Sequence, residues 1–474
     1  MRNAKLDLDY VQGWADDVNF VDKTVDVEPS VLDPAQSYAQ TQARSGPADE
    51  DKLIPEEEKL MEQQDNVRLQ DHVPIFPIKY DKLVVTVGSY SQTFNTPGIR
   101  ENAYFLKDIG DARKIRKRIL ELFELCHMPF ITDEVRSQLL HFCIVGAGPT
   151  GMEFAGNLSD LIHEDLSKMH PKYMKFVKIT VYDVAPKVLP MFDAALADYA
   201  TRQYRRKNID IRTDHHVEEL RKGPPSYHGS QDNIPPGRVF TIKTKEDGEV
   251  GIGMCVWSTG LMNNPFIAKA LDRVRRFPVE SALVTEGPQI DTSNPRKWII
   301  ERHPKTGGVM VDDHFRIQLQ ARTAEEEEGK ESNVQGHAVM QDVFAIGDCT
   351  MLKGIEPPLP ATAQVANQEA KFLAKMFNKH YDSSKGGFDA EAYAQASAFN
   401  FHSRGVMTFL GGSKAILQGP NTKSDVAGQG LRGFLAYLIW RGVYLTLTLS
   451  GKNRFLIPVY WLAVKLFGRS VSRF

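Results

Sequence analysis

Three glycines form a turn between an apolar run and a helical pattern in the stretch "HFCIVGAGPTGMEFAGNLSDLI", residues 141–162. We expect Gly146 to permit a tight turn, Gly148 to let a pyrophosphate approach the backbone, and Gly151 to let the helix pack on the strand. The helix amino terminus then offers free N–H groups and a partial positive charge to phosphates. A lone G-x-G-x-x-G also fits a turn that binds nothing, but the flanking strand and helix favour a dinucleotide site.

An acidic residue ends the next apolar strand, "VKITVYDV", residues 177–184. The carboxylate of Asp183 is placed to accept hydrogen bonds from the ribose of an adenosine. It would repel a 2′-phosphate, so the sequence favours NADH over NADPH. The alternative for Asp183 is a place in an ordinary surface turn.

A second strand with a glycine at its end occurs in "DVFAIGDCTMLKGIEPPLPATAQVANQEAKFLAKMF", residues 342–377. Gly347 admits the close approach of a phosphate or ribityl chain, and Asp348 can accept a hydroxyl hydrogen bond. A helix predicted to begin near Ala361 would direct its amino terminus at a flavin ring and stabilise negative charge there. A Gly-Asp pair after a strand is also a common turn, which is the alternative here.

Composition limits the class of protein that can carry these turns. The chain has 474 residues and 42% hydrophobic residues, enough for about three domains, and its formal charge of -2 gives no reason to expect nucleic acid. Four scattered cysteines contain no C-x-x-C pair, so neither a disulfide framework nor a metal site is predicted, and a reducing compartment fits best. The amino terminus resembles neither a signal peptide nor a transit peptide.

The elements that must position these residues follow from periodicity. A hairpin is predicted about Asp22 and Lys23, a strand over 80–89, and a helix over 108–125 with Ile115, Ile119, Leu122 and Leu125 on one face. A strand from Leu140, the glycine turn, a helix to about Ser167 and the strand ending at Asp183 make one βαβ unit. "RVFTIKT" and "VGIGMCVWSTG" form a strand pair, 34–69 is expected to be disordered, and 324–336 a solvated loop.

Together these stretches resemble the type II NADH:quinone dehydrogenases, in particular their mitochondrial fungal and plant branch. The resemblance covers nearly all of 80–474 and rests on "YDKLVVTVGSYSQTFNTPGIRENAYFLKDIGDARKIRKRI", "CIVGAGPTGMEFAGNL", "VLPMFD", "VWSTG", "VFAIGDC", "PPLPATAQVANQEA" and "GRSVSRF". It implies an α/β flavoprotein with two dinucleotide-binding, Rossmann-like domains, in the superfamily of the disulfide reductases. Because Cys349 has no redox partner nearby in the sequence, the disulfide reductase branch itself is disfavoured.

Site residues carried over by this resemblance fall into two groups. NADH would be bound by Gly146, Gly148, Gly151 and Asp183, and FAD by Gly347 and Asp348. Glu153 resembles the family's acid beside the nicotinamide, while Ala363, Gln364 and Gln368 resemble a segment near the isoalloxazine and the quinone. The remaining cofactor contacts implied are Ala147, Pro149, Thr150, Thr259 and Gly260. Hydride would pass from NADH to FAD and electrons from FAD to ubiquinone, with Glu153, Gln364 and Gln368 as the catalytic residues.

The carboxyl-terminal segment carries an independent signal. Residues 431–474 contain no Asp or Glu, and seven Lys or Arg residues punctuate two apolar, aromatic runs. Arg441 and the break at Ser450-Gly451 argue against a single spanning helix. Amphipathic helices lying in a lipid interface are therefore predicted, with packing on the protein's own core or on a dimer partner as the alternative.

One expected motif is missing. Residues 1–79 contain no G-x-G-x-x-G, so the first βαβ unit of an FAD domain is not predicted there. The predicted organisation is 1–79 as the remnant of the FAD domain, 80–139 as an FAD-domain segment and connecting helix, 140–275 as the NADH domain, 276–418 as the rest of the FAD domain, and 419–474 as a membrane anchor. A truncated sequence and a natural remnant without turnover are both interpretations of the gap.

Three functions therefore compete at the level of sequence. They are a peripheral NADH:ubiquinone oxidoreductase of the mitochondrial inner membrane, a catalytically silent NADH-binding membrane protein, and another flavin reductase of this fold related to apoptosis-inducing factor. The tail and the "AQVANQ" segment favour the first over the third. A homodimer, the quinone used and the side of the membrane stay open.

Overall fold

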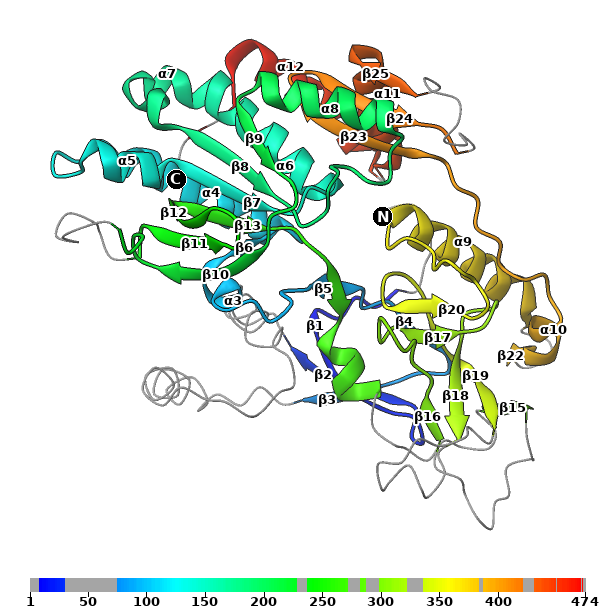
Figure 1. The fold of residues 1–474 in the computed structure, drawn as a ribbon. Coiled ribbons are helices and arrows are strands. Elements are labelled where there is room, and N and C mark those ends of the chain that lie inside the picture. The colour runs from blue at the N-terminus through cyan, green and yellow to red at the C-terminus, as the bar shows by residue number, and fades with distance from the viewer. Residues whose placement is uncertain are drawn as a thin grey trace. The chain divides into compact units, whose positions relative to one another are not determined.

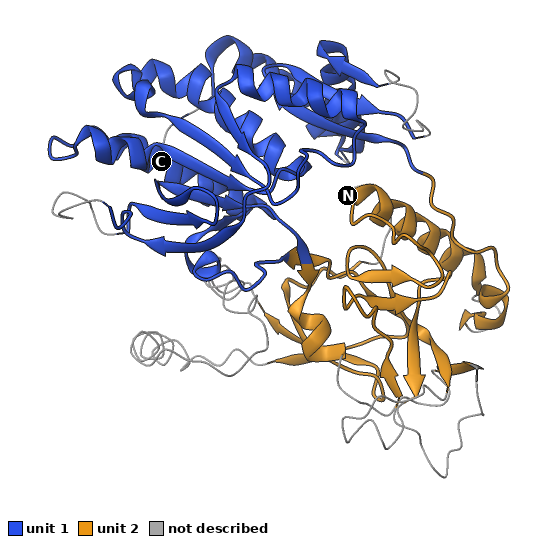
Figure 2. Cartoon of the chain, viewed as in Figure 1, with its two compact units in different colours: residues 1–4, 91–261, 403–474 blue, residues 5–90, 262–402 orange. Residues whose placement is uncertain are grey.

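The computed structural model describes residues 8–29, 75–227, 237–271, 282–286, 298–321, 336–382, 387–420, 430–448, 450–469 and 471. The chain divides into two compact units (Figure 2). Unit 1 contains residues 91–261 and 403–474, and unit 2 contains residues 5–90 and 262–402. Each unit has its own apolar core.

Unit 1 is built on a parallel sheet of five strands in the order β6-β13-β7-β8-β9 (Figure 1). The strands are β6 (Tyr104–Phe105), β13 (Met254–Trp257), β7 (His141–Val145), β8 (Lys178–Tyr182) and β9 (Ile209–Arg212). All five residues of the central strand β7 are buried, as expected for a strand covered on both faces. The predicted βαβ unit is confirmed, because β7 and β8 pair in parallel across a helical connection.

The two faces of this sheet are covered differently because side chains alternate along each strand. Phe142 and Ile144 point into a core shared with helices, whereas Cys143 and Val145 point into a core shared with an antiparallel sheet. The helices are α4 (Ile109–Leu125), α5 (Asp133–Leu139), α6 (Pro149–Asp160) and α8 (Ala194–Arg206), and the antiparallel strands are β10 (Val217–Lys222), β11 (Phe240–Thr244) and β12 (Gly248–Ile252).

The structure of unit 1 tests two of the sequence predictions. The helix predicted over 108–125 is α4, with Ile115, Ile119 and Leu122 buried. The predicted strand pair is confirmed for β11 and β12, but the end of "VGIGMCVWSTG" leaves that pair and enters the parallel sheet as β13. Gly253 separates β12 from β13, and a β-carbon there would overlap the carbonyl of Leu139.

Helix α6 extends beyond its regular part. It continues as a π-helical segment η1 (Leu161–Leu166), then α7 (Ser167–Met169) and a 3-10 turn η2 (Pro171–Phe176). The predicted helix end near Ser167 is therefore confirmed.

Helix α6 also packs closely on a small antiparallel sheet of β23 (Val406–Gly411), β24 (Lys414–Gln418) and β25 (Leu431–Gly433). A β-carbon on Gly156 would lie 3.0 Å from the backbone of Leu410, so a larger residue would force the helix and the strand apart by a few tenths of an ångström. Near the end of α6, the N–H of Gly412 donates to Asp160 Oδ2 at 2.8 Å, and Lys207 pairs with the same carboxylate. β23 and β24, predicted within 276–418, thus belong to unit 1.

Two helices follow this sheet: α11 (Phe434–Leu447) and α12 (Gly451–Phe467). The predicted break is confirmed, since the side chain of Ser450 caps α12 by accepting from the N–H of Asn453. Trp440 stacks on Phe409 of β23, with ring centroids 5.2 Å apart. The large apolar side chains exposed on the two helices are Phe434, Leu435, Leu438, Tyr444, Leu447, Phe455, Leu456, Val459, Tyr460, Leu462, Leu466 and Phe467.

We call α11 and α12 the tail helices. Among the described residues, no helix combines the length and the apolar character needed to cross a membrane. Ten leucine, valine and phenylalanine side chains and two tyrosine side chains of the tail helices are exposed, so the core of unit 1 does not cover them.

The end of α12 is tied back to the connection after α6. Arg469 Nη1 lies 2.8 Å from Asp165 Oδ2, and the Arg469 N–H donates to Asp165 Oδ1 at 3.1 Å. Asp165 is buried within η1, and Val471 packs on the core of unit 1. The tail helices are therefore held at two places: Trp440 on α11 contacts Phe409, and Arg469 after α12 contacts Asp165.

Unit 2 contains a three-stranded antiparallel sheet of β1 (Gly13–Asn19), β2 (Thr24–Pro29) and β3 (Phe76–Lys79). The predicted hairpin is confirmed, and Lys23 in its turn has a φ of 51°. A larger sheet has the order β15-β19-β18-β17-β20, with β4 paired to β19 and β16 to β18. Its strands are β4 (Leu83–Val85), β15 (Ala282–Glu286), β16 (Trp298–Ile300), β17 (Val309–Val311), β18 (Arg316–Ala321), β19 (His337–Ala345) and β20 (Thr350–Leu352).

Helix α9 (Ala363–His380) packs on this larger sheet through Leu373 and Met376. The strand predicted over 80–89 is regular only in β4, where it pairs in parallel with the end of β19. The remaining elements are α3 (Ile99–Asn102), α10 (Ala390–Ala394), η3 (Ile267–Leu271), β5 (Ser89–Ser91), β14 (Leu261–Asn263), β21 (Tyr381–Asp382) and β22 (Gly387–Phe388). The segment 34–69 and nearly all of 324–336 lie outside the described residues.

Removing the Arg469 side chain should loosen the tail. Arg469→Ala leaves the buried Asp165 carboxylate without its cation, so we expect the free energy of unfolding to fall by about 1 to 2 kcal/mol. Urea unfolding measures the change, and Lys465→Ala, an exposed cation on α12, is the matched control with an expected change within about 0.5 kcal/mol. Equal values for the two variants would contradict a role for the Arg469–Asp165 contact.

Candidate functional site

The glycine turn between β7 and α6 has the geometry expected of a phosphate cradle. Gly146 has a φ of 112°, and a β-carbon on it would lie 2.7 Å from the carbonyl oxygen of Ser258. A β-carbon on Gly151 would overlap the carbonyl oxygen of Gly146. Gly148, by contrast, has no atom within 4 Å of such a position. Its open side is what the close approach of a pyrophosphate requires.

The first turn of α6 faces this opening without a side-chain cap. Gly148 is the N-cap residue, and it supplies no side-chain acceptor. Pro149 occupies the first helical turn, where its missing N–H costs nothing. Thr150 is exposed at the same end. The N–H groups of this first turn have no side-chain acceptor, so an anion on the open side of Gly148 would accept hydrogen bonds from them.

Asp183 lies where the sequence predicted it, just after β8. One carboxylate oxygen accepts from the N–H of Ala147 at 2.5 Å and the other accepts from the N–H of Ala185 at 2.7 Å. These bonds hold the glycine turn against the end of β8. The carboxylate thus has a structural role in the turn, and its predicted contact with a ribose stays a prediction.

The residues that follow β13 lie beside the glycine turn. Ser258 donates to the carbonyl of Val145 at 3.0 Å and fixes the start of the turn. The Thr259 hydroxyl is buried and makes no hydrogen bond to the other described residues. Gly260 follows with a φ of 52°. Because a buried hydroxyl without a partner costs free energy, Thr259 is suited to bind a polar group of a ligand.

Glu153 is placed differently from a freely available catalytic acid. Its carboxylate accepts from the Thr408 hydroxyl at 2.9 Å and from the Phe409 N–H at 2.8 Å, and so joins α6 to β23. Burial raises the pKa of Glu153, while the Phe409 N–H, the Thr408 hydroxyl and the nearby Trp440 indole oppose the rise. The structure assigns Glu153 a packing role, and its place beside a nicotinamide stays a prediction.

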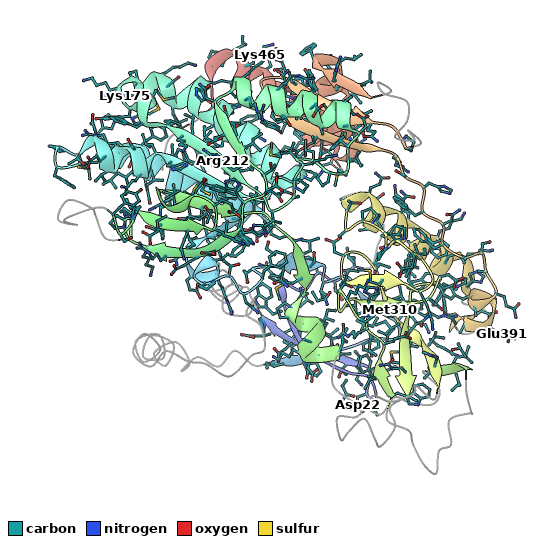
Figure 3. All side chains as sticks on the ribbon, viewed as in Figure 1. Asp22, Lys175, Arg212, Met310, Glu391 and Lys465 are labelled. Atoms are coloured by element: carbon teal, nitrogen blue, oxygen red, sulfur yellow. The ribbon has the colours of Figure 1, made fainter. Side chains whose placement is uncertain are left out.

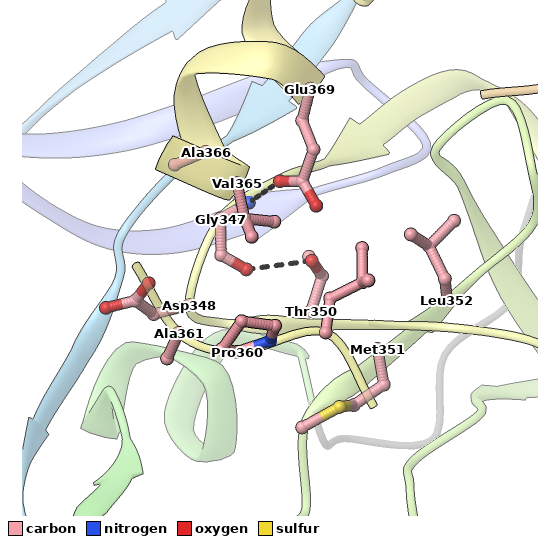
Figure 4. A pocket seen from close by; sticks show the side chains of 11 residues that line it. Gly347, Asp348, Thr350, Met351, Leu352, Pro360, Ala361, Val365, Ala366 and Glu369 are labelled. Carbon is pink, nitrogen blue, oxygen red and sulfur yellow. Dashed lines mark hydrogen bonds between the residues drawn. The ribbon is translucent and has the colours of Figure 1, made fainter. Parts of the chain in front are cut away.

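Unit 2 carries the second candidate site, at the end of β19 (Figure 4). Gly347 has a φ of 83°, and its N–H donates to Glu369 Oε2 at 2.7 Å. Asp348 Oδ2 accepts from the Ser89 hydroxyl at 3.2 Å. A small pocket opens here, lined by Gly347, Asp348, Thr350, Met351, Leu352, Leu359, Pro360, Ala361, Val365, Ala366 and Glu369.

Helix α9 begins beside this pocket, two residues later than the predicted start at Ala361. Thr362 caps it by accepting from the N–H of Val365. Ala363 and Gln364 lie in its first turn, with Ala363 exposed. Gln368 uses both ends of its amide on the backbone of His402, at 2.9 Å and 3.1 Å. Gln368 therefore fastens the chain that follows α10, and a contact of Gln368 with quinone stays a prediction.

The sequence analysis did not single out Glu369. Its side chain is 2% exposed, and burial raises its pKa against the hydrogen bond from Gly347, with Asp348 nearby adding to the rise. An acid at the same helical spacing as Val365 and Leu373 lies in an apolar stripe, which is the signal that could have identified it. Glu369 fixes the backbone of Gly347, the residue on which the second site depends.

The described residues offer only part of the site that an FAD molecule would need. Gly347, Asp348 and the amino terminus of α9 fit the ribityl chain and ring, since a strand end, a carboxylate and helix N–H groups converge there. The described residues include no second glycine turn of the kind found at Gly146, and the sequence has no second G-x-G-x-x-G before Lys79. The residues present therefore fit the ring half of FAD and leave its pyrophosphate without a cradle.

Comparison with known proteins adds independent information on both units. The family model described as pyridine nucleotide-disulphide oxidoreductase matches residues 35–290, and the NDH2 C-terminal domain model matches residues 403–470. The chain is 31% identical over 400 residues to the probable NADH dehydrogenase of Dictyostelium discoideum, covering 84% of this chain and 70% of that protein.

The chain belongs to the type II NADH dehydrogenase family. It is also 30% identical over 424 residues to the mitochondrial external NADH-ubiquinone oxidoreductase 2 of Saccharomyces cerevisiae, covering 85% of this chain and 65% of that protein. The chain spans about two thirds of the length of such relatives. The structure of NDH2 from Plasmodium falciparum in complex with NADH has the same fold, with a TM-score of 0.65 and 20% identity over 98% of this chain and 85% of that chain.

The three glycines of the turn should separate folding from nucleotide binding. Gly148→Ala meets no atom, so stability should change by less than about 0.5 kcal/mol, while NADH binding should weaken by about tenfold or more because phosphate hydrogen bonds lengthen. Gly151→Ala should lower stability by about 3 kcal/mol through overlap with the Gly146 carbonyl, although alanine favours a helix. Thermal unfolding and titration with NADH measure both effects. Equal loss of stability in the two variants would refute this division of roles.

Glu153 should affect stability in two ways. Glu153→Ala leaves the Phe409 N–H and the Thr408 hydroxyl without an acceptor, so we expect the free energy of unfolding to fall by about 2 to 4 kcal/mol. Glu134→Ala, at an exposed position, is the control and should change it by less than about 0.5 kcal/mol.

The second effect of Glu153 is a dependence of stability on pH. Glu153→Gln keeps an acceptor and cannot ionise. Because the folded state holds the Glu153 proton more tightly, wild type should lose stability relative to Glu153→Gln as the pH rises from about 4.3 through the raised pKa, then level off. Unfolding at a series of pH values tests this, and a difference that does not vary with pH would exclude it.

Proposed function

We propose that this protein is a non-proton-pumping NADH:ubiquinone oxidoreductase that works at a membrane surface. Its membership of the type II NADH dehydrogenase family supports this, as do the names of the relatives in yeast and Dictyostelium. The single observation that carries the NADH half of the proposal is the glycine turn of unit 1, where Gly148 is open and Gly146 and Gly151 are closed by neighbouring backbone.

In this proposal unit 1 binds and orients NADH. The pyrophosphate lies on the open side of Gly148 at the start of α6, against the N–H groups of Thr150 and Gly151, with Ala147 and Pro149 beside it. The ribose of the adenosine lies toward Asp183, whose carboxylate disfavours the 2′-phosphate of NADPH. The Thr259 hydroxyl and Gly260 contact the part of NADH beyond the pyrophosphate. Glu153 acts by holding α6 on β23, which positions the turn.

Unit 2 provides for the redox group. FAD, when bound, accepts a hydride from NADH and passes two electrons to a quinone. Gly347 and Asp348 would hold its ribityl chain, with Ala363 and Gln364 near the ring. Glu369 keeps Gly347 in place, and Gln368 keeps the following chain against α9. The pyrophosphate of FAD needs a strand–glycine–helix turn, and residues 1–79 contain no G-x-G-x-x-G that would form one.

The tail helices are the proposed point of contact with the membrane that supplies the quinone. Their exposed apolar side chains are accompanied by basic residues and by no acidic ones. Such helices lie in a lipid interface through buried apolar area and attraction to anionic lipids. Several relatives carry mitochondrial names, which supports a mitochondrial location, and we propose that the protein is peripheral to the inner membrane.

A second candidate function is NADH binding at a membrane without turnover. The specific observation in its favour is the absence of a G-x-G-x-x-G from residues 1–79, where the first βαβ unit of an FAD domain is expected. A flavin held only by Gly347, Asp348 and α9 loses several charge-assisted hydrogen bonds, each worth about 1.5 to 3 kcal/mol, or a thousandfold or more in affinity for about three of them.

Flavin content and turnover together distinguish the two functions. We expect residues 1–474 to purify with little flavin and to show negligible NADH:quinone activity, and a version extended upstream with a strand–glycine–helix unit to be yellow and active. The extended protein should oxidise NADH faster than NADPH. Flavin absorbance per chain and NADH oxidation with a short-chain ubiquinone measure this. NADH binding without turnover in both versions would favour the second function, and tight FAD in residues 1–474 would show that another segment replaces the missing turn.

A further inference from the structure

Arg441 occupies an unusual place between the two tail helices. It lies one helical turn after Tyr437 on α11, and its guanidinium is over that ring at 4.8 Å from the centroid. The ring of Trp461 on α12 covers it from a second helix at 4.2 Å. Two aromatic faces from two helices therefore hold the guanidinium in a fixed position, which removes much of the flexibility of an arginine side chain.

The positive charge of Arg441 is not neutralised within the tail. Residues 431–474 contain no Asp or Glu. The part of the chain that the structure describes offers Arg441 neither an ion pair nor a hydrogen-bond acceptor, and its Nε is buried without a partner. Two other arginines of the tail differ in this respect: Arg469 pairs with Asp165, and Arg454 donates to the carbonyl of Thr448 at 2.7 Å. A half-buried guanidinium whose N–H groups have no acceptor favours the binding of an anion.

The surroundings of Arg441 indicate which anion that is. Leu438 and Tyr444, one turn to either side on α11, are exposed, and so are Val459, Tyr460 and Leu462 beside Trp461 on α12. A free anion in water would leave this apolar surface uncovered. A phospholipid satisfies both requirements, because its phosphodiester lies at the depth where aromatic rings of interfacial helices lie, with acyl chains directly below.

We propose that Arg441, held between Tyr437 and Trp461, is a binding site for the phosphodiester of a membrane phospholipid. The inference rests on the proposed contact of the tail helices with a membrane and names the residue that recognises the headgroup. The arginine fork donates to two phosphate oxygens, which a lysine cannot reproduce. The site would fix the rotation of the tail helices at the surface, because one side of α11 must face the phosphates.

Neutral phosphatidylcholine vesicles give the sharpest test, because they carry phosphodiesters but no net surface charge. With the full chain, Arg441→Gln should weaken binding to these vesicles by about tenfold or more through loss of charged hydrogen bonds. Lys465→Gln, which removes an exposed cation from α12 (Figure 3), is the matched control and should change binding less than about twofold without a surface potential. Trp461→Leu keeps apolar area but frees the guanidinium, and should reproduce most of the loss seen in Arg441→Gln.

The outcomes separate the site from the proposed function. If wild type binds no vesicle, the membrane contact itself fails. If wild type binds and Arg441→Gln equals Lys465→Gln, with both variants unfolding at the temperature of wild type, the Arg441 site is refuted while the membrane contact stands. Inorganic phosphate at millimolar concentration should not displace the protein from vesicles; tight phosphate binding that Arg441→Gln abolishes would assign the site to a free anion and overturn the proposal. Arg441→Lys should recover less than half of the lost affinity.

Discussion

The close packing of α6 on β23 is the constraint on which the rest of unit 1 depends. Gly156 lets the helix approach the strand, and the carboxylates of Glu153 and Asp160 accept from backbone N–H groups on either side of that approach. Helix α6 is the same helix whose amino terminus forms the glycine turn. A single helix thus joins the predicted nucleotide site, the parallel sheet and the carboxyl-terminal sheet. A small shift of α6 would therefore change the contacts in all three places.

The tail helices take their position from the same packing. Trp440 stacks on Phe409, the residue whose N–H is bonded to Glu153, and Arg469 returns to Asp165 in the extension of α6. Both attachments are therefore made to α6 or to the strand that it touches. The apolar side chains left exposed between these attachments are held in place by unit 1, which distinguishes them from side chains on a loosely tethered segment.

Local signals predicted much of this fold. The glycine turn, α4, the hairpin of β1 and β2, and the break before α12 all depend on residues near one another in sequence, where glycine, capping side chains and apolar spacing act directly. Contacts over long sequence distances were not accessible in the same way. The entry of β13 into the parallel sheet beside β7 depends on Gly253 lying against Leu139, which no local pattern encodes.

The candidate sites show the same limit. Residue types placed Asp183 and Gly347 at strand ends correctly, but not the partners that hold them: the N–H of Ala147 for the first and the Glu369 carboxylate for the second. Glu153 illustrates the difficulty most clearly, because an acid in a glycine-turn helix was expected to face a ligand, and its bonds to β23, 255 and 256 residues away in sequence, were not predicted. Charge and position in a motif do not by themselves state which way a side chain is directed.

The composition of the tail has one further consequence, which concerns metal ions. Besides lacking Asp and Glu, residues 431–474 contain no His and no Cys. The side chains that most often bind metal ions in proteins are therefore absent from this segment. Ca²⁺ or Mg²⁺ near a lipid surface would compete with the basic side chains of the tail for anionic lipid, because the tail has no side chain of these four types with which to bind the ion itself.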